Sequence, residues 1–424
     1  MTDEPCSKRT KRHDRWGDSS SEDEDEAPRN SPVTGISNCC DSNQRSLPDQ
    51  TKNSNSLHPS ENSIVTGARD GQTRNISTEE IIDKAKGKFR KHNPGIHGCR
   101  EVSSSYERIS RISEGTYGIV WRARDVATNE IVALKQIKFH DDLVHDGFPH
   151  PALREIWALL ALSHECIVNV REMVVGTRSD RVFMAMDYME MDLSTALDRC
   201  DKTGNPLPQS ELKMVMHNIL SGMLHIHENW YMHRDMKTSN ILIRRSSGRA
   251  CICDFGLARK YSSPPKIYTQ LVITLWYRPP ELLFGTNVYG PEVDIWSTGC
   301  IFGELFTKSA LMQGCGELDQ IEKIFRLLGG PNEENWPNFK SLPNAKNFRW
   351  RSKNGPPQIH KLFPINGFST GGSRTYLDVR GLDLLCKMLT LDPKKRIGAA
   401  EALQHPYFTE GVKMQKPRFV FDDE

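Results

Sequence analysis

The sequence lacks the features of a membrane-spanning, secreted or zinc-binding protein. No apolar run of this 424-residue chain approaches the length of a membrane span, and the N-terminus has no signal-peptide core. The 11 cysteines are scattered without Cys/His zinc spacing, which indicates reduced thiols in the cytosol or nucleus. No Gly-x-x-x-x-Gly-Lys-Ser/Thr phosphate loop occurs, so a P-loop NTPase is excluded.

Aromatic residues are nearly missing from the first hundred residues, where only Trp16 and Phe89 occur. Such a segment buries too little apolar surface to order itself, so residues 1–105 are predicted to be a disordered, low-complexity region. Its basic run at 8–12 fits a nuclear import patch and its acidic block at 19–26 a phosphorylation target, but a merely solvated tail fits both equally. Basic residues are not interleaved with aromatic ones, so direct nucleic-acid binding is not expected.

The most informative stretch is His-Arg-Asp-Met at 233–236, which is followed by Lys237 and Asn240 and then by Asp-Phe-Gly at 254–256. Each motif alone is weak, but the two together in this order and spacing are specific. In such a loop Asp235 holds the hydroxyl to be phosphorylated and Lys237 stabilises the γ-phosphate. Asn240 and Asp254 hold magnesium. The pattern therefore predicts a phosphoryl-transfer site.

A glycine-containing hairpin upstream is predicted to cover the phosphates of a nucleotide. Glycine lets the backbone approach phosphate oxygens closely, although this pattern alone is equally typical of a plain β-turn. The next strand carries Lys135 to the α- and β-phosphates, and Glu155 on the following helix orients that lysine through an ion pair. The candidate nucleotide-binding residues of the hairpin are Ile112, Ser113, Glu114, Gly115, Thr116, Tyr117, Gly118, Ile119 and Val120.

Together these motifs resemble the eukaryotic protein kinases over residues 106–408. The segment Pro-His-Pro-Ala-Leu-Arg-Glu at 149–155 is similar to the cyclin-contacting helix of the cyclin-dependent kinases, closest to the PITSLRE subfamily. Gly-Cys-Arg at 98–100, the run at 170–176 and His-Glu-Asn-Trp at 227–230 fit the same branch. The resemblance implies a serine/threonine kinase that uses ATP and Mg²⁺, binds a cyclin through the helix containing Pro149 to Glu155, and acts on Ser-Pro or Thr-Pro sites.

The fold class implied is α+β, a two-lobed protein kinase fold. A small β-rich N-lobe with one key helix is expected at 106–186, a hinge at 187–192 and a larger, mainly helical C-lobe at 193–408, with a short C-terminal tail at 409–424. In the hinge, the backbone of Asp187 and Met189 would bind adenine. The sequence pattern predicts strands at 106–112, 117–125, 130–138, 167–175 and 181–188, and a helix at about 149–163.

Helical periodicity also marks core elements of the larger lobe. A stripe of apolar residues from 212 to 226 predicts a buried helix, for which Ser210 is a plausible cap. By resemblance, Asp294 hydrogen-bonds the catalytic-loop backbone, and Glu281 pairs with Arg396. Both roles are structural, so mutating these residues is expected to reduce folding before chemistry.

The resemblance also implies how the enzyme is regulated. Arg154, Arg234 and Arg259 are expected to converge on phosphorylated Thr269, because three guanidinium groups with no anion between them would repel one another. Thr116 and Tyr117 are candidate inhibitory phosphorylation sites, with plain β-structure as the alternative.

Departures from the family pattern limit the comparison, among them Pro279, which stands where alanine is usual. Ser113 replaces the first glycine of the hairpin, which the other two glycines make tolerable. Pro151 lies inside the signature helix and is acceptable only near its first turn, which leaves the identity of the cyclin open.

Two functional readings remain open. An active kinase needs five residues that are all present: Lys135, Glu155, Asp235, Asn240 and Asp254. The alternative is a catalytically weak kinase-fold scaffold that binds a cyclin. A nuclear location is expected, otherwise a cytoplasmic one, and the process served is cell-cycle control, or transcription and RNA processing.

Overall fold

The computed structural model describes residues 98–115, 118–137, 149–176, 181–264, 266–346, 348, 357–364 and 376–421. All of them belong to one unit of the chain, residues 75–424. Residues 1–97, with the expected disorder, import patch and acidic block, lie outside the described residues. So do Thr116 and Tyr117, and these expectations stay predictions.

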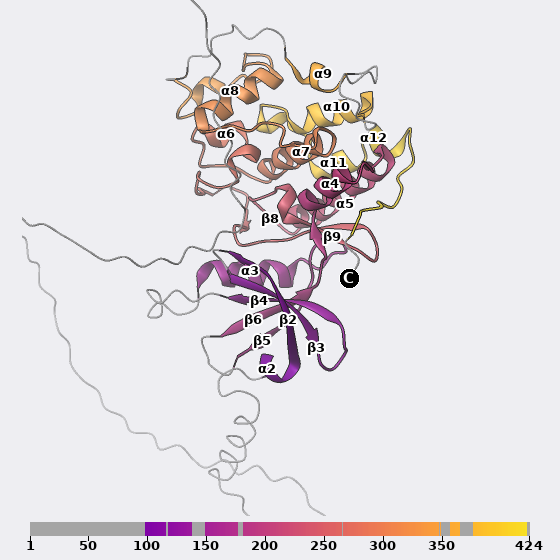
Figure 1. Ribbon diagram of the computed structural model, residues 1–424. Coiled ribbons are helices and arrows are strands. Elements are labelled where there is room, and N and C mark those ends of the chain that lie inside the picture. Colours follow the sequence, from indigo (N-terminus) through magenta and orange to yellow (C-terminus); the bar gives the residue numbers. More distant parts are fainter. Residues whose placement is uncertain are drawn as a thin grey trace, which may run out of the picture. The chain divides into compact units, whose positions relative to one another are not determined.

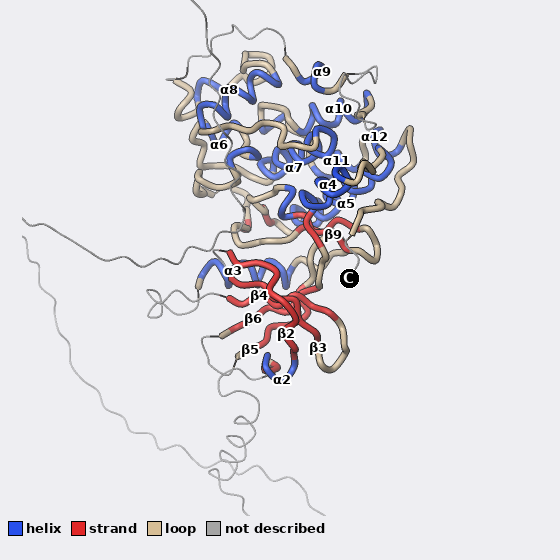
Figure 2. The backbone as a smooth tube through the Cα atoms, in the orientation of Figure 1, coloured by secondary structure: helices blue, strands red, loops and turns tan. Residues whose placement is uncertain are grey.

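The N-terminal part of the described chain is a six-stranded sheet with one long helix, and the C-terminal part is mainly helical (Figures 1 and 2). The expected α+β architecture is therefore confirmed. Along the sheet the order is β1-β5-β6-β4-β3-β2, and every neighbouring pair is antiparallel except β1 and β5. The strands are β1 (Arg100–Glu101), β2 (Tyr106–Gly115), β3 (Gly118–Asp125), β4 (Ile131–Ile137), β5 (Val170–Val175) and β6 (Val182–Asp187).

The segment that precedes β5 differs from the expected strand at 167–175. Instead of joining the sheet, Ile167 forms a parallel bridge with Ile252 of the helical part. The Ile252 N–H donates to the Cys166 carbonyl at 2.8 Å, and the Val168 N–H donates to the Ile252 carbonyl at 3.0 Å. The apolar run is buried as its composition predicts, but its backbone ties the two parts of the molecule together.

A short edge strand that the periodicity did not predict begins the described chain. β1 pairs with β5, and its first residue, Arg100, contacts acidic groups of two other strands. Its guanidinium donates to Asp125 Oδ2 at 2.7 Å and to Glu172 Oε1 through Nε at 2.9 Å, and the Tyr106 hydroxyl also contacts Glu172. Helix α2 (Val102–Ser105) then leads into β2. Two of the segments noted for their family resemblance, 98–100 and 170–176, thus meet at the sheet edge.

Helix α3 (His150–Ala161) carries the signature segment and packs against the sheet (Figure 1). Pro149 occupies its N-cap and Pro151 its first turn, where a missing N–H removes no helical hydrogen bond. Proline at 151 is therefore compatible with this helix.

The helical part is organised around two buried helices, α5 (Gln209–Glu228) and α7 (Glu292–Thr307). Leu212, Val215, Ile219, Met223 and Ile226 of α5 are all at most 1% exposed, which confirms the predicted apolar stripe. The remaining helices are α4 (Leu193–Lys202), α6 (Pro280–Leu283), α8 (Glu317–Leu328), α9 (Ile359–Leu362), α10 (Val379–Met388), α11 (Ala399–Leu403) and α12 (Pro406–Thr409).

The expected cap of α5 is wrong. Pro208 holds the N-cap position, where its fixed φ suits a helix start, and Ser210 lies inside the first turn. The Ser210 hydroxyl instead donates to Gln415 Oε1 at 3.4 Å.

Residues 410–418 form a C-terminal strap that returns across the start of α5 (Figure 1, yellow). Lys213 is fully buried, and its ammonium donates to the carbonyls of Glu410 and Val412 at 3.0 and 2.7 Å. Glu211, also buried, accepts from the Arg418 backbone at 2.8 Å and from its guanidinium at 2.7 Å. The strap therefore satisfies two charges at the start of α5 that are otherwise enclosed by protein.

Short strands and 3₁₀ turns connect the helices. β10 (Arg249–Ile252), β9 (Ile241–Arg244) and β7 (Met191–Asp192) form one small sheet, and β11 (Arg259–Lys260) and β8 (Tyr231–Met232) form another. The 3₁₀ turns are η2 (Thr238–Asn240), η3 (Leu275–Tyr277), η4 (Phe339–Ser341) and η5 (Pro393–Lys395). No helix within the described ranges is long and apolar enough to cross a membrane.

The buried ion pair expected between Glu281 and Arg396 is present. Arg396 NH1 and NH2 donate to the two carboxylate oxygens at 2.8 and 3.0 Å, and both side chains are at most 2% exposed. Arg396 NH1 also donates to the Glu292 carbonyl at 2.8 Å, which joins the pair to the start of α7.

Replacing Arg396 by methionine is expected to reduce the free energy of unfolding by about 3–5 kcal/mol, because the Glu281 carboxylate is left buried and unpaired. Thermal and denaturant unfolding of the full chain measure this loss. Arg380→Met, which removes the exposed Arg380–Glu410 pair, is the control and should change stability by less than about 1 kcal/mol. Equal losses in the two variants would contradict a special role for the buried pair.

Candidate active site

The predicted catalytic residues converge on the Asp235 carboxylate, in the loop between β8 and β9. Lys237 Nζ donates to Asp235 Oδ2 at 2.8 Å, and Asn240 Nδ2 donates to the same oxygen at 3.1 Å. The Thr274 hydroxyl donates to Oδ1 at 3.0 Å. Asp235 is only 8% exposed, so its carboxylate is held by neighbouring donors and not by bulk water.

The ionisation of Asp235 is set by two opposing influences. Burial alone would raise the pKa of the carboxyl, but the hydrogen bond and charge of Lys237, with smaller help from His233 and Thr274, bring the pKa below its usual value. The side chain is therefore a carboxylate at neutral pH, able to accept a hydrogen bond from a hydroxyl group.

The backbone of the catalytic loop is fixed by Asp294 of α7. This fully buried carboxylate accepts from the N–H groups of His233 and Arg234 at 2.9 and 2.8 Å, and it lies 3.0 Å from His227 Nε2. Burial raises the pKa of Asp294, but these hydrogen bonds, that of His227 foremost, lower it overall. The geometry agrees with the structural role expected for Asp294.

His233 links the loop to the Asp-Phe-Gly segment. Its Nδ1 accepts from the Asp235 N–H at 3.2 Å, so the ring carries its proton on Nε2, 2.9 Å from the Cys253 carbonyl. The ring packs edge-on against Phe255, with the ring centroids 4.9 Å apart. Asp254, which lies between Cys253 and Phe255, has a φ of +64°. These contacts hold an aspartate in a left-handed conformation beside the catalytic loop.

Lys135 and Glu155 form the expected ion pair between β4 and α3. Lys135 Nζ lies 2.5 Å from Glu155 Oε1, and the side chains are 12% and 7% exposed. Burial would lower the pKa of Lys135, but the negative charges of Glu155 and Asp254 raise it overall, so the ammonium stays charged. Because Asp254 influences this lysine, the lysine, its glutamate and the Asp-Phe-Gly aspartate share one electrostatic site.

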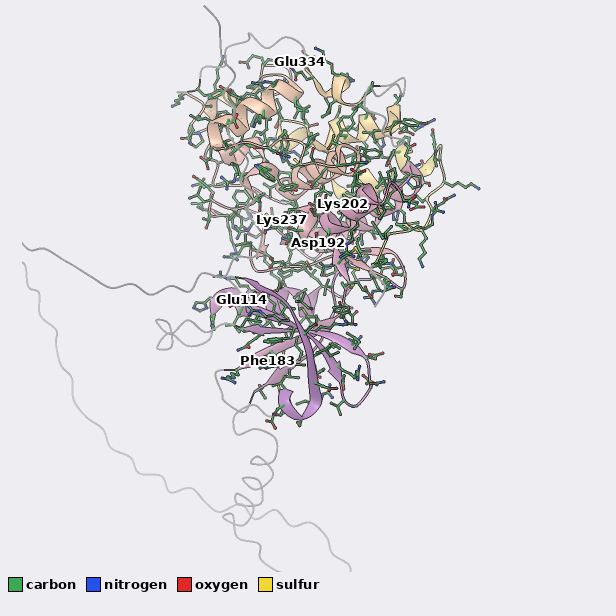
Figure 3. All side chains as sticks on the ribbon, viewed as in Figure 1. Glu114, Phe183, Asp192, Lys202, Lys237 and Glu334 are labelled. Carbon is green, nitrogen blue, oxygen red and sulfur yellow. The ribbon has the colours of Figure 1, made fainter. Side chains whose placement is uncertain are left out.

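The hairpin and hinge candidates come from the elements around this site. Ile112, Ser113 and Glu114 lie on β2, Ile119 and Val120 on β3, and Asp187 and Met189 at and after the end of β6. Figure 3 labels Glu114 near the hairpin and Lys237 on the helical part. The need for glycine at Gly118 has a structural cause, because a Cβ there would lie 2.1 Å from the Gln136 carbonyl oxygen.

Asn240 and Asp254 are the candidate metal ligands. The Asn240 amide nitrogen donates to the Asp235 carbonyl at 2.8 Å, which leaves the amide oxygen as the atom available to a cation. One carboxylate and one amide oxygen are a donor set that suits a hard divalent cation shared with phosphates. In the part of the chain that the structure describes, no group of three or more His, Cys, Asp or Glu forms a separate metal centre.

The three predicted regulatory arginines influence one another. Burial, followed by the positive charges of Arg234 and Arg154, lowers the pKa of Arg259 to about 10. Arg234 NH1 donates to the Tyr289 hydroxyl at 2.9 Å, which donates to the Thr269 carbonyl at 2.7 Å. Thr269 itself is exposed to solvent. A cluster of positive charge is thus tied to the backbone of the predicted phosphorylation site.

Sequence reasoning missed several residues that position the site. Glu304 of α7 is buried and accepts from Thr238 at 3.0 Å and Tyr277 at 2.7 Å, so it joins the catalytic loop to η3. Tyr289 bridges Arg234 to Thr269. No local motif marks either residue, because each acts on elements distant in sequence.

Comparison with known proteins agrees with this geometry. The protein kinase domain family matches residues 106–408. Cyclin-dependent kinase G-2 of Oryza sativa subsp. indica is 48% identical over 74% of this chain and 43% of its own length, and cyclin-dependent kinase G1 of Arabidopsis thaliana is 48% identical over 74% and 50%. Cyclin-dependent kinase 11B of Rattus norvegicus is 42% identical over 77% of this chain and 70% of its own length. The chain belongs to the cyclin-dependent kinase family of protein kinases.

Membership of this family confirms the resemblance inferred from the motifs. The match covers half or less of the length of the rice and Arabidopsis relatives.

Replacing Lys237 by methionine is expected to raise the pKa of Asp235, because the ammonium that holds the carboxyl ionised is removed. The carboxylate would then be lost at a higher pH as the solution is acidified. The ¹³C shift of the carboxyl carbon, assigned with Asp235→Asn, follows the titration. Lys340→Met, on an exposed lysine, is the control. An unshifted Asp235 titration would contradict the assignment.

Proposed function

We propose that this chain is a cyclin-dependent, proline-directed protein serine/threonine kinase that transfers the γ-phosphate of ATP to Ser and Thr hydroxyls. The observation that carries the proposal is the Asp235 carboxylate, held together by Lys237, Asn240 and Thr274. A carboxylate fixed in this way can accept the hydrogen bond of an attacking hydroxyl and orient it in line with the leaving phosphate.

The nucleotide would be held by charges and backbone groups. Lys135, oriented by Glu155, would contact the α- and β-phosphates, and the backbone of Asp187 and Met189 would bind adenine. Mg²⁺ at Asn240 and Asp254 would neutralise the phosphate charge. With the phosphates fixed, Asp235 needs only to position the hydroxyl and accept its proton, while Lys237 offsets charge on the transferred group.

The need for a cyclin is supported by the two faces of α3. Glu155, Ile156 and Leu159 point into the protein, with at most 8% exposure. On the other face, three large apolar residues at helical spacing face solvent: Leu153 at 36%, Trp157 at 72% and Leu160 at 57% exposure. An apolar stripe centred on an exposed tryptophan is typical of a protein-binding face. A cyclin on this face would fix α3, and so the position of Glu155.

The preference for proline is supported by the backbone at Ile273. This β-branched residue has φ of +68°, and its carbonyl accepts from Arg278 Nε at 3.2 Å and NH2 at 3.0 Å. The Val272 carbonyl accepts from the same guanidinium at 2.9 Å. Arg278 thus engages both carbonyls, which makes them poor acceptors for the N–H of a bound substrate. A proline after the phosphorylated residue has no N–H to leave unpaired.

Control by phosphorylation is supported by the arginine cluster. Burial, and after it the positive charges of Arg234 and Arg154, lowers the pKa of Arg259. A phosphate on exposed Thr269 would pair with all three arginines. A nuclear location, with the cytoplasm as the alternative, depends on the basic run at 8–12 alone.

Trp157→Ala is expected to weaken binding of the cyclin that co-purifies with the full chain by about 2 kcal/mol or more, roughly 30-fold or more. Because Trp157 is exposed, the stability of the free chain should change little. Biolayer interferometry gives the affinity. The matched control is Leu318→Ala on α8, because Leu318 is 70% exposed. Unchanged cyclin affinity in Trp157→Ala would refute the assignment of this face.

The cyclin-bound, Thr269-phosphorylated enzyme is expected to favour Ser-Pro over Ser-Ala peptides by about tenfold to hundredfold, since any other residue buries an unpaired N–H at roughly 1–3 kcal/mol. Steady-state kcat/KM values for paired Ser-Pro and Ser-Ala peptides measure this preference. Transfer without proline preference would sink the specificity assignment.

Asp254→Asn, which removes a candidate metal ligand without opening a cavity, should abolish phosphoryl transfer. If the wild-type chain binds a cyclin but transfers no phosphate, the result would favour the scaffold.

A further inference from the structure

The hinge carries an ion network that the mechanism above does not use. Asp187, the last residue of β6, is 14% exposed and lies between two arginines. Arg171 Nε of β5 donates to Asp187 Oδ1 at 2.8 Å, and Arg244 NH2 of β9 donates to Oδ2 at 2.8 Å. Arg171 also pairs with Glu130, which precedes β4. A single carboxylate therefore joins a strand of the N-terminal sheet to a strand of the helical part.

The same end of β9 holds the rest of the hinge. The Arg245 N–H donates to Glu190 Oε2 at 2.8 Å, and β7 pairs with β9 through Met191 and Ile243. The Asp187 N–H donates to the Asn169 carbonyl at 3.1 Å, so its backbone is also fixed. Both acidic side chains between residues 187 and 190 thus attach the hinge to neighbouring backbone and side chains.

We propose that the Arg171–Asp187–Arg244 bridge positions the hinge for nucleotide binding, so that Arg244 sets ATP affinity without touching the nucleotide. This rests on the proposed function, in which the backbone of Asp187 and Met189 binds adenine. The Asp187 side chain and backbone belong to one residue, so the two arginines that hold the carboxylate also restrict the orientation of the backbone carbonyl. Hydrogen bonds weaken steeply when their geometry is lost. Arg244 is the last residue of the short strand β9, and Asn240 directly precedes that strand, so the bridge also couples the hinge to the catalytic loop.

Substitutions that remove one charge of the bridge at a time can test its role. Asp187→Asn keeps the volume of the side chain but removes its charge, and Arg244→Met removes the partner on β9. Arg244→Lys keeps the positive charge and is the rescue variant. Arg380→Met is the matched control, because it deletes an Arg–carboxylate pair on α10, where Arg380 Nε lies 2.9 Å from Glu410.

The experiment measures the dissociation constant of MgATP by isothermal titration calorimetry on the full chain, and kcat and KM for ATP on the cyclin-bound enzyme. Asp187→Asn and Arg244→Met are each expected to weaken ATP binding roughly threefold to tenfold, as for a partly buried charged hydrogen bond. The double variant should be no weaker than the worse single one, because both delete the same bridge. Arg244→Lys should recover most of the affinity. For Arg244→Met, kcat at saturating ATP should stay within about twofold, so that the loss lies in KM.

The outcomes separate this inference from the proposed function. If the wild-type chain binds MgATP and both single variants bind it equally well, the positioning role is wrong. Additive losses in the double variant, or an equal loss in Arg380→Met, would also overturn it. If the wild-type chain binds no MgATP at all, the proposed function itself fails, and this inference fails with it.

Discussion

The catalytic loop depends on one buried carboxylate. Asp294 has no exposed surface, and it accepts hydrogen bonds from two consecutive backbone N–H groups, those of His233 and Arg234. Arg234 has φ of +65°, a conformation that a non-glycine residue adopts only when its surroundings enforce it. With the backbone so fixed, Asp235 faces Lys237 and Asn240, and the Arg234 guanidinium reaches Tyr289. The contacts of the candidate catalytic and regulatory residues thus share one anchor.

Three non-glycine residues of the site have a left-handed backbone with positive φ. Asp254 and Ile273 have φ of +64° and +68°, in addition to Arg234. Each is held by bonds to other elements: His233 to the Cys253 carbonyl, and Arg278 to the Ile273 carbonyl. The strain of these conformations is therefore offset by hydrogen bonds made in the folded state. Substituting His233 or Arg278 would remove hydrogen bonds that support the backbone of the site.

Much of the candidate site could be predicted because its residues lie in short, ordered motifs. The catalytic loop, the Asp-Phe-Gly segment and the signature helix are local patterns, and family membership supports them. The buried pair of Glu281 and Arg396 came from the same resemblance. Local rules failed at the cap of α5, because Pro208 suits a helix start as well as Ser210 does, and the serine is taken by the strap.

The contacts that sequence reasoning missed are those between distant segments. Arg100 meets Glu172 across 72 positions, and Glu304 meets Thr238 across 66. Neither pair has a periodicity or spacing that a window of sequence could detect. The same holds for the hinge, where Asp187 and Arg244 are 57 positions apart. Such pairs follow from the tertiary fold and become visible only once it is known.

The C-terminal strap has a consequence for biosynthesis. The buried ammonium of Lys213 finds its acceptor at Glu410, a separation of 197 residues. During translation, the first turn of α5 exists long before its partner has been made, and a charged lysine cannot be enclosed without acceptors. The start of α5 must therefore stay hydrated until the strap emerges, and closing so distant a contact is slow. A ribosome-bound chain that stops before residue 410 lacks both carbonyls that accept from Lys213, so the first turn of α5 has no strap over it at that stage.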